Sequence, residues 1–305
     1  MTADDRSGRV GVRGLTKRFG PVAAVEDLSF DAPPGAVTGF LGPNGSGKTT
    51  TLRMILGLVV PTGGEARING VPFAALPRPA RVVGAVLEAQ GFHPARTGRR
   101  HLLACAAAIG VPDAVVEVGL AAVGLLDAAD RAVGGYSLGM KQRLALAVAM
   151  LGDPQVLILD EPGNGLDPEG IAWMRSFLRG FAARGRTVLV SSHLLGEIEQ
   201  TADRLVVISR GRCVYQGGLA ELRASRRARV LVRCADPVRL ARELGASGVV
   251  EIDTLPDGRL GVADADAVRV GDVALAAGVA VYGLVQETID LEQLFFQLTT
   301  GQWRS

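Results

Sequence analysis

Apolar residues in the first part of the chain follow two successive patterns, one typical of a strand and the next typical of a helix. Ala36 to Leu41 is a short, mostly apolar run, which is typical of a buried strand. Leu52, Ile55 and Leu56 then recur at the spacing of one helix face. Together the two segments predict a strand, a loop and a helix in succession, as in an α/β fold.

Two longer regions continue this organisation. Residues 88–152 are rich in Ala, Leu and Val at helical spacing and predict a helical subdomain. Residues 153–220 return to alternating strands and helices. Within them, residues 205–209 and 213–216 predict a hairpin across Gly211.

The last part of the chain predicts a separate small α+β domain. From residue 229 to 299 the pattern is strand, helix, strand, strand, helix, strand, helix, which resembles a ferredoxin-like domain. Asp257-Gly258 predicts a hairpin turn, and Asp290 to Leu298 predicts an amphipathic helix. The expected strands are Val230 to Val232, Val249 to Asp253, Arg259 to Val262 and Val281 to Val285.

Composition and charge narrow the class of protein. The 305 residues suffice for roughly two domains of about 150 residues each. The 33 basic and 31 acidic residues give a net charge of +2, which offers no electrostatic argument for nucleic acid, and we expect no such partner. Three scattered cysteines match neither zinc spacing nor a disulfide framework and indicate a reducing compartment.

The sequence carries no signal for membrane insertion. The polar segment Met1 to Arg9 lacks the apolar centre of a signal peptide. The longest apolar runs, residues 144–151 and 274–285, fall short of the about 18 to 20 residues of a membrane span. We therefore expect a protein that is soluble when isolated and reaches a membrane through a partner.

Residues 42–49 read Gly-Pro-Asn-Gly-Ser-Gly-Lys-Thr and fit the phosphate-binding loop of nucleotide triphosphatases. Glycines let the backbone N–H groups approach an anion closely, and the following helix directs its positive end at the same phosphates. Lys48 is expected to reach the β- and γ-phosphates, and the Thr49 hydroxyl to ligate Mg²⁺. ATP and Mg²⁺ are therefore the expected cofactors.

A second acidic motif follows a predicted buried strand. Val156 to Leu159 is apolar and is followed by Asp160 and Glu161. Such a strand brings both carboxylates to the edge of a parallel sheet where α/β proteins bind ligands. Asp160 is placed to hold Mg²⁺, directly or through water, and Glu161 to act as general base.

Three further motifs identify a resemblance. Residues 136–143, Tyr-Ser-Leu-Gly-Met-Lys-Gln-Arg, are similar to the signature of ABC-type ATPases. The order and spacing of the other motifs match this family as well, from a D-loop at residues 164–168 to a histidine, His193, after a predicted strand. The resemblance covers about residues 9–220 as one ATPase domain with a RecA-like core and the helical subdomain at about 88–152. It leaves a flexible N-terminus at residues 1–8 and a C-terminal accessory domain at 221–305.

The resemblance implies a head-to-tail dimer with ATP between the phosphate loop of one subunit and the signature of the other. Ser137 begins a predicted helix, so its hydroxyl and the helix N-terminus would face the γ-phosphate; the alternative is an ordinary helix cap. His193 would sense the γ-phosphate, and Phe19 would stack on the adenine ring unless it is a core residue. The nucleotide-binding residues implied are Phe19, Gly42, Pro43, Asn44, Gly45, Ser46, Gly47, Lys48, Thr49, Thr50, Ser137, Gly139 and Asp167. The catalytic residues are Glu161, His193 and Lys48, and the metal ligands are Thr49, Asp160 and Glu88.

The sequence departs from the family pattern at a few positions. Glu88 stands where the family places a Mg²⁺-linked glutamine, with Gln90 as the competing choice. A carboxylate can ligate Mg²⁺, so the chemistry need not be lost. Leu138 and Gly163 replace a usual glycine and a common threonine, while Met140 is common in relatives of this type.

Two basic segments have alternative interpretations. The segment Thr97 to His101 is either a solvated helix face or a contact for an acidic coupling segment of a membrane partner. The arginines of residues 223–229 form either a solvated linker or a contact for anionic lipid headgroups.

The predicted function is the ATP-hydrolysing motor of an ABC exporter. Two copies, or one copy and a homologous ATPase subunit, would drive separate permease subunits at the cytoplasmic face of the membrane. Glu88 and the ending at residues 291–296 are similar to subunits that export antibiotics or peptide antibiotics. The alternative is a soluble ABC-type ATPase not coupled to transport, but the stretch between Thr49 and Asp160 is too short for the coiled coil of DNA-repair relatives. The single phosphate loop also differs from the two-domain translation factors.

Overall fold

The computed structural model describes residues 8–87, 91–224, 229–263, 265–287 and 295. The chain divides into two compact units, and Leu219 is the last residue of the first before the second begins at Ala220. Phe295 groups with the first unit. Each unit is described below by itself.

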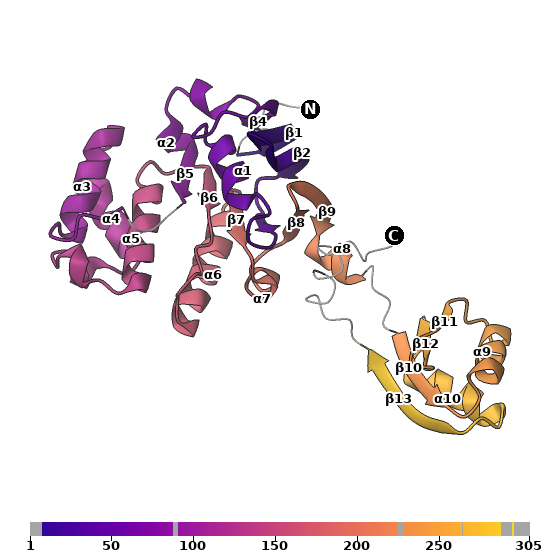
Figure 1. Ribbon diagram of the computed structural model, residues 1–305. Coiled ribbons are helices and arrows are strands. Elements are labelled where there is room, and N and C mark those ends of the chain that lie inside the picture. The colour runs from indigo at the N-terminus through magenta and orange to yellow at the C-terminus, as the bar shows by residue number, and fades with distance from the viewer. Residues whose placement is uncertain (1–7, 88–90, 225–228, 264, 288–294, 296–305) are drawn as a thin grey trace. The chain divides into compact units, whose positions relative to one another are not determined.

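A six-stranded sheet forms the centre of the first unit, in the order β5-β6-β7-β3-β8-β9 (Figure 1). Its strands are β3 (Val37–Leu41), β5 (Val83–Val86), β6 (Val156–Leu159), β7 (Thr187–Ser192), β8 (Arg204–Ser209) and β9 (Arg212–Gly218). All neighbours pair in parallel except β9, which pairs with β8 as the expected hairpin. Every residue of β3, β6 and β7 is buried, which explains their continuous apolar or small-residue sequences.

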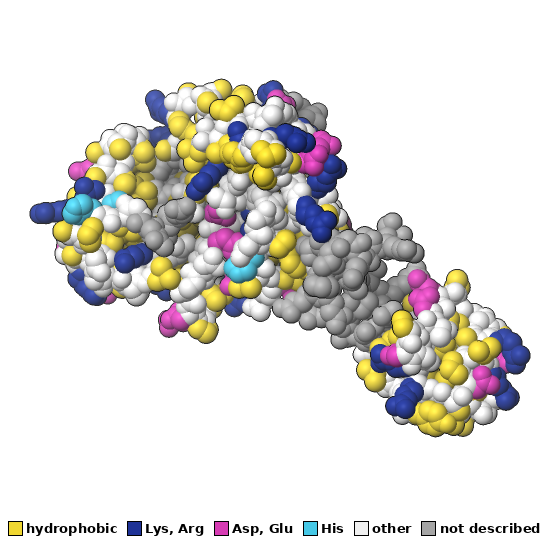
Figure 2. Space-filling view, in the orientation of Figure 1, with side chains coloured by type: hydrophobic (Ala, Val, Ile, Leu, Met, Phe, Trp, Pro, Cys, Tyr) yellow, Lys and Arg dark blue, Asp and Glu magenta, His cyan; other side chains and the backbone are white. Residues whose placement is uncertain are grey.

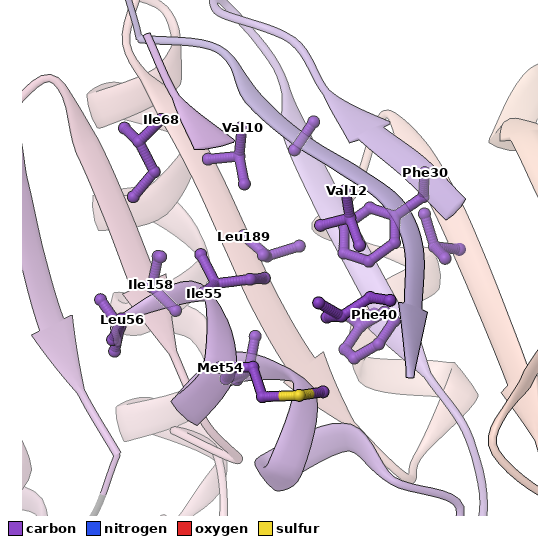
Figure 3. Close-up of a cluster of buried hydrophobic side chains, with 14 of the residues drawn as sticks. Val10, Val12, Phe30, Phe40, Met54, Ile55, Leu56, Ile68, Ile158 and Leu189 are labelled. Atoms are coloured by element: carbon purple, nitrogen blue, oxygen red, sulfur yellow. The ribbon is translucent and has the colours of Figure 1, made fainter. Parts of the chain in front are cut away.

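A second, antiparallel sheet orders its strands β2-β1-β4. These are β1 (Val10–Phe19), β2 (Val22–Ala32) and β4 (Gly63–Ile68). Helix α1 (Lys48–Ile55) contributes Met54 and Ile55 to one apolar core shared with both sheets (Figure 3). This core fixes the end of β3 against the start of α1, so the loop between them is anchored on both sides.

Helices α3 (Gly98–Ile109), α4 (Ala114–Ala122) and α5 (Leu138–Met150) form the helical subdomain (Figure 1). Arg99 forms ion pairs with Asp130 and Glu117. One arginine of the basic segment 97–101 is therefore bonded within the subdomain. The other helices of the unit are α2 (Pro79–Val82), η2 (Phe73–Ala75), η3 (Leu126–Ala128), η4 (Val133–Gly135), α6 (Pro168–Ala182) and α7 (Leu195–Glu199).

The second unit is an α+β domain. It opens with α8 (Leu219–Ala224), whose first residue still belongs to the first unit, and its sheet has the order β11-β12-β10-β13. The elements are β10 (Arg229–Cys234), α9 (Pro237–Ala246), β11 (Ile252–Thr254), β12 (Leu260–Ala263), α10 (Ala267–Ala276) and β13 (Val281–Glu287). This succession is the expected ferredoxin-like one, with its own apolar core. The predicted helix at residues 290–298 lies outside the described residues except for Phe295, which is helical.

The surface carries both signs of charge. On the face shown in Figure 2, basic and acidic side chains are interspersed over both units, in keeping with the small net charge. Among the helices that the structure describes, none is both long and apolar enough to cross a membrane.

Candidate nucleotide-binding site

The backbone of residues 42–49 encloses a concave space between β3 and α1. Gly45 and Gly47 have φ values of +77° and +104°, where an L side chain would be strained. A Cβ on Gly47 would lie 2.5 Å from the carbonyl oxygen of Ala24. The Ser46 hydroxyl is buried without a hydrogen-bond partner in the described part of the chain. Since buried hydroxyls are normally bonded, this loop fits an anion such as a phosphate.

Lys48 is buried at the floor of this loop, with 6% of its side chain exposed. Its Nζ donates to the carbonyl oxygen of Gly42 at 2.7 Å and lies 3.2 Å from Oε1 of Glu161. The ammonium group is therefore both hydrogen-bonded and paired, as a buried charge requires.

The Thr49 hydroxyl donates to Oδ2 of Asp160 at 2.6 Å. The Ser191 hydroxyl, from the end of β7, donates to Oδ1 of the same carboxylate and accepts from the Glu161 N–H at 2.9 Å. Hydroxyl and carboxylate oxygens are the ligands that Mg²⁺ prefers. The ends of β6 and β7 and the start of α1 thus meet at one group of hard oxygen atoms.

Glu161 and His193 form a close pair beside this group. Nδ1 of His193 lies 2.7 Å from Oε2 of Glu161. The backbone of Glu161 has φ +49°, a left-handed conformation that is uncommon for a residue with a side chain and is typically found at functional sites. The bond from its N–H to Ser191 holds this turn in place.

Lys48, Thr49, Glu161 and His193 line one cleft of about 310 Å³. Two of its lining residues were not predicted as site residues: Ala24, which lies on β2, and Asn164, which was named only as the first residue of the D-loop. The described lining residues are Ala24, Asn44, Gly45, Gly47, Lys48, Thr49, Thr50, Glu161, Asn164 and His193.

The signature residues and Asp167 of the D-loop lie elsewhere. Ser137 caps α5, accepting from the Met140 N–H at 3.2 Å, and Asp167 caps α6, accepting from the Gly170 N–H at 2.8 Å. Among the described residues that line the cleft, neither cap nor Gly139 occurs. A subunit's own signature therefore does not complete its own cleft.

Leu138 has a specific place within its own chain. Its side chain, 44% exposed, occupies the space where a Cβ on Gly165 would stand. Gly165 has φ +73°, so the D-loop offers a bare backbone at this point. The bulk of Leu138 is directed at its own D-loop, and this contact was not foreseen from the sequence.

Of the remaining predicted site residues, the structure describes Phe19 but not Glu88. Phe19 ends β1 with 52% of its surface exposed, and Nζ of Lys17 lies 5.0 Å from its ring centroid. It is therefore not a core residue, and the Lys17 ammonium covers one face of its ring. Glu88 and Gln90 lie outside the described residues, so the choice between them stays a prediction.

The fold and the cleft define a P-loop ATPase with a helical subdomain inserted into its core. The family model described as ABC transporter matches residues 25–164. The chain is 44% identical over 206 residues to the bacitracin transport ATP-binding protein BcrA of Bacillus licheniformis, covering 66% of this chain and 67% of the relative. It is 37% identical over 258 residues to the bacitracin transport ATP-binding protein BcrA of Enterococcus faecalis, and this match covers 84% of each chain. The chain belongs to the family of ABC transporter ATP-binding subunits, and it is an ATPase, as the motifs predicted.

Other relatives agree with this assignment. The Nod factor export ATP-binding protein I of Burkholderia lata is 42% identical over 68% of this chain and 70% of its own length. A solved ATP-binding subunit of an ABC transporter superposes with a TM-score of 0.64 at 29% identity, covering 71% of this chain and 92% of that chain. A dimeric bacterial ABC transporter cassette has a TM-score of 0.63 at 20% identity over 69% and 98% of the two chains, a likeness of fold. A model described only as a domain of unknown function matches residues 228–292.

Proposed function

We propose that this chain is the ATP-driven motor subunit of an exporter, working as a head-to-tail dimer on separate permease subunits. The observation that supports it most is the incomplete cleft: the phosphate loop, Glu161 and His193 converge on it, whereas the helix cap at Ser137 lies elsewhere in the chain. A second copy would supply that cap and its helix N-terminus to the γ-phosphate.

The described residues fit MgATP. Gly45, Gly47 and the Ser46 hydroxyl would bind phosphate oxygens, with Lys48 placing its charge on the β- and γ-phosphates. Thr49 and Asp160 would hold Mg²⁺, which neutralises phosphate charge when bound; Glu88 is proposed as a further ligand. Thr50, Phe19 and Asp167 are proposed to contact the nucleotide.

Glu161 and His193 are proposed to act on the attacking water. The carboxylate of Glu161 would orient the water and accept its proton, and His193, 2.7 Å away, would hold the carboxylate and sense the γ-phosphate. Opening of the dimer after hydrolysis would reset the cycle, so that ATP binding and loss drive movement of the permease.

The cargo is proposed from the relatives. Because relatives at 37% to 44% identity are bacitracin transport subunits, we propose an antibiotic or peptide antibiotic. The permease would hold the subunit at the cytoplasmic face of the membrane. The domain 221–305 is proposed to regulate the ATPase, to contribute to dimerisation or to dock on a partner. Its described part shows no arrangement of catalytic residues.

Affinity purification from native membranes tests this proposal. The Glu161→Gln variant, incubated with MgATP, is expected to retain a multi-spanning permease, because the ATP-bound dimer persists when hydrolysis is blocked. Mass spectrometry identifies the retained proteins, with Lys48→Met as the control that should not be locked in the ATP-bound state because it binds ATP weakly. Recovery of soluble partners or ribosomes without any membrane-spanning protein would instead support a soluble ABC-type ATPase.

A further inference from the structure

A second carboxyl group lies beside the turn that carries His193. Glu197, in α7, is half-buried, and its Oε2 is 3.4 Å from the hydroxyl oxygen of Ser192. That hydroxyl oxygen accepts a hydrogen bond from the Leu194 N–H at 3.0 Å. Ser192 and Leu194 flank His193 in the sequence, so Glu197 contacts the base of this turn.

The same carboxylate also contacts the turn that carries Glu161. A Cβ on Gly163 would lie 2.7 Å from Oε2 and 3.1 Å from Oε1 of Glu197. The carboxylate thus packs against bare backbone, an approach for which glycine leaves room. Because Gly163 is two residues from Glu161, one side chain touches both turns of the catalytic pair.

The surroundings of Glu197 are mostly apolar. It lines a cavity between α6, β7 and α7 together with Gly163 and Ser192; the apolar wall comes from Ile171, Met174, Leu178, Val190 and Ile198. Burial raises the pKa of the Glu197 carboxyl, and the nearby Glu161 raises it further, while the Ser192 bond and His193 lower it. Arg175 of α6 is the other charged residue on the wall of this cavity.

We infer that Glu197 is a positioning residue whose carboxylate holds the turn of His193 against the turn of Glu161. The inference rests on the roles proposed above for those two residues. A glutamine at 197 keeps the length of the side chain but loses the charge that strengthens the bond from Ser192. The catalytic pair then loses its alignment, which slows turnover without weakening nucleotide binding.

Steady-state ATP hydrolysis by the full chain tests this assignment. We expect Glu197→Gln to lower kcat about five- to twentyfold and to change KM for ATP less than about twofold. Ser192→Ala removes the donor to Glu197 and also the acceptor of the Leu194 N–H, so it is expected to lower kcat at least as far, and adding Glu197→Gln to it should lower kcat little further. Glu169→Gln, which removes an exposed carboxylate from the first turn of α6, is the matched control for the loss of one carboxylate and should keep wild-type kcat.

The pH dependence separates positioning from simple support of the fold. The folded-state pKa of Glu197 is raised above its ordinary value of 4.5, so the charged form costs folding free energy at higher pH. Glu197→Gln should therefore have an equal or higher Tm than wild type at pH 7, and no difference below the ordinary pKa. The ratio of wild-type to Glu197→Gln kcat should fall towards one as pH falls through the raised pKa, because a protonated carboxyl resembles the amide.

Three results would overturn the inference: a wild-type kcat for Glu197→Gln, additive effects of Ser192→Ala and Glu197→Gln, or a lowered Tm at pH 7 that accompanies the loss of kcat. Glu161→Gln is assayed alongside. If Glu161→Gln keeps its turnover, the proposed catalytic roles fail and the inference fails with them. If Glu161→Gln is inactive and Glu197→Gln is wild type, only the inference fails.

Discussion

Glu161→Gln is expected to lower kcat for ATP hydrolysis by about 10² to 10⁴ while leaving MgATP binding intact. The amide has the shape of the carboxylate but cannot accept a proton from water. Lys48, 3.2 Å from Oε1, keeps its bond to Gly42 and remains available to the phosphates. Single-turnover hydrolysis and equilibrium binding of a fluorescent ATP analogue measure the two effects separately.

The matched control is Glu169→Gln, which removes an exposed carboxylate from the first turn of α6. It should keep wild-type kcat. A Glu161→Gln variant that still hydrolysed ATP at the wild-type rate would exclude Glu161 as the general base. Another group on the cleft would then have to accept the proton.

Lys48→Met is expected to weaken ATP binding by about 10- to 150-fold, the effect of losing one hydrogen bond to a charged group, and to abolish hydrolysis at cellular ATP concentrations. Methionine keeps most of the apolar stem but has no charge for the phosphates. Isothermal titration calorimetry with MgATP measures the change in Kd.

Removal of Lys48 also leaves Glu161 without its buried cation, which is expected to destabilise the fold. The double variant Lys48→Met/Glu161→Gln removes that unpaired charge and provides the control. Its Tm should return towards wild type while its ATP affinity stays low. Wild-type affinity in either variant would contradict the role proposed for Lys48.

The fold was predictable where local patterns are strong. Runs such as Val156 to Leu159 read as buried strands because both faces of β6 are covered, and the phosphate loop requires glycine for reasons that hold in any protein. The hairpin of β11 and β12 was placed correctly, but its bounds differ from those expected: β11 is shorter and begins at Ile252 rather than Val249, and β12 is shifted by one residue, to Leu260–Ala263. Strand ends depend on pairing partners that the pattern alone does not show.

The contacts that support the cleft residues were harder to predict than the cleft residues themselves. Ser191 binds both Asp160 and the Glu161 N–H, but a serine at the end of an apolar strand gives no signal of this in the sequence. Gly163 was visible as a departure from the family, yet its consequence, the close approach of Glu197, depends on the packing of α7. Such contacts join segments distant along the chain, so they follow from tertiary structure alone.

The central claim is that each active site is shared between two subunits, and mixing two inactive variants tests it most directly. Lys48→Met lacks a working phosphate loop and Ser137→Arg lacks a working signature, so each should be inactive alone. In a mixed dimer, the loop of one chain and the signature of the other restore one complete site. We predict recovery of up to about a quarter of wild-type ATPase activity, because half of the dimers would be mixed and each would hold one intact site of two. Activity no greater than the sum of the separate variants, with mixed dimers present, would contradict the shared site.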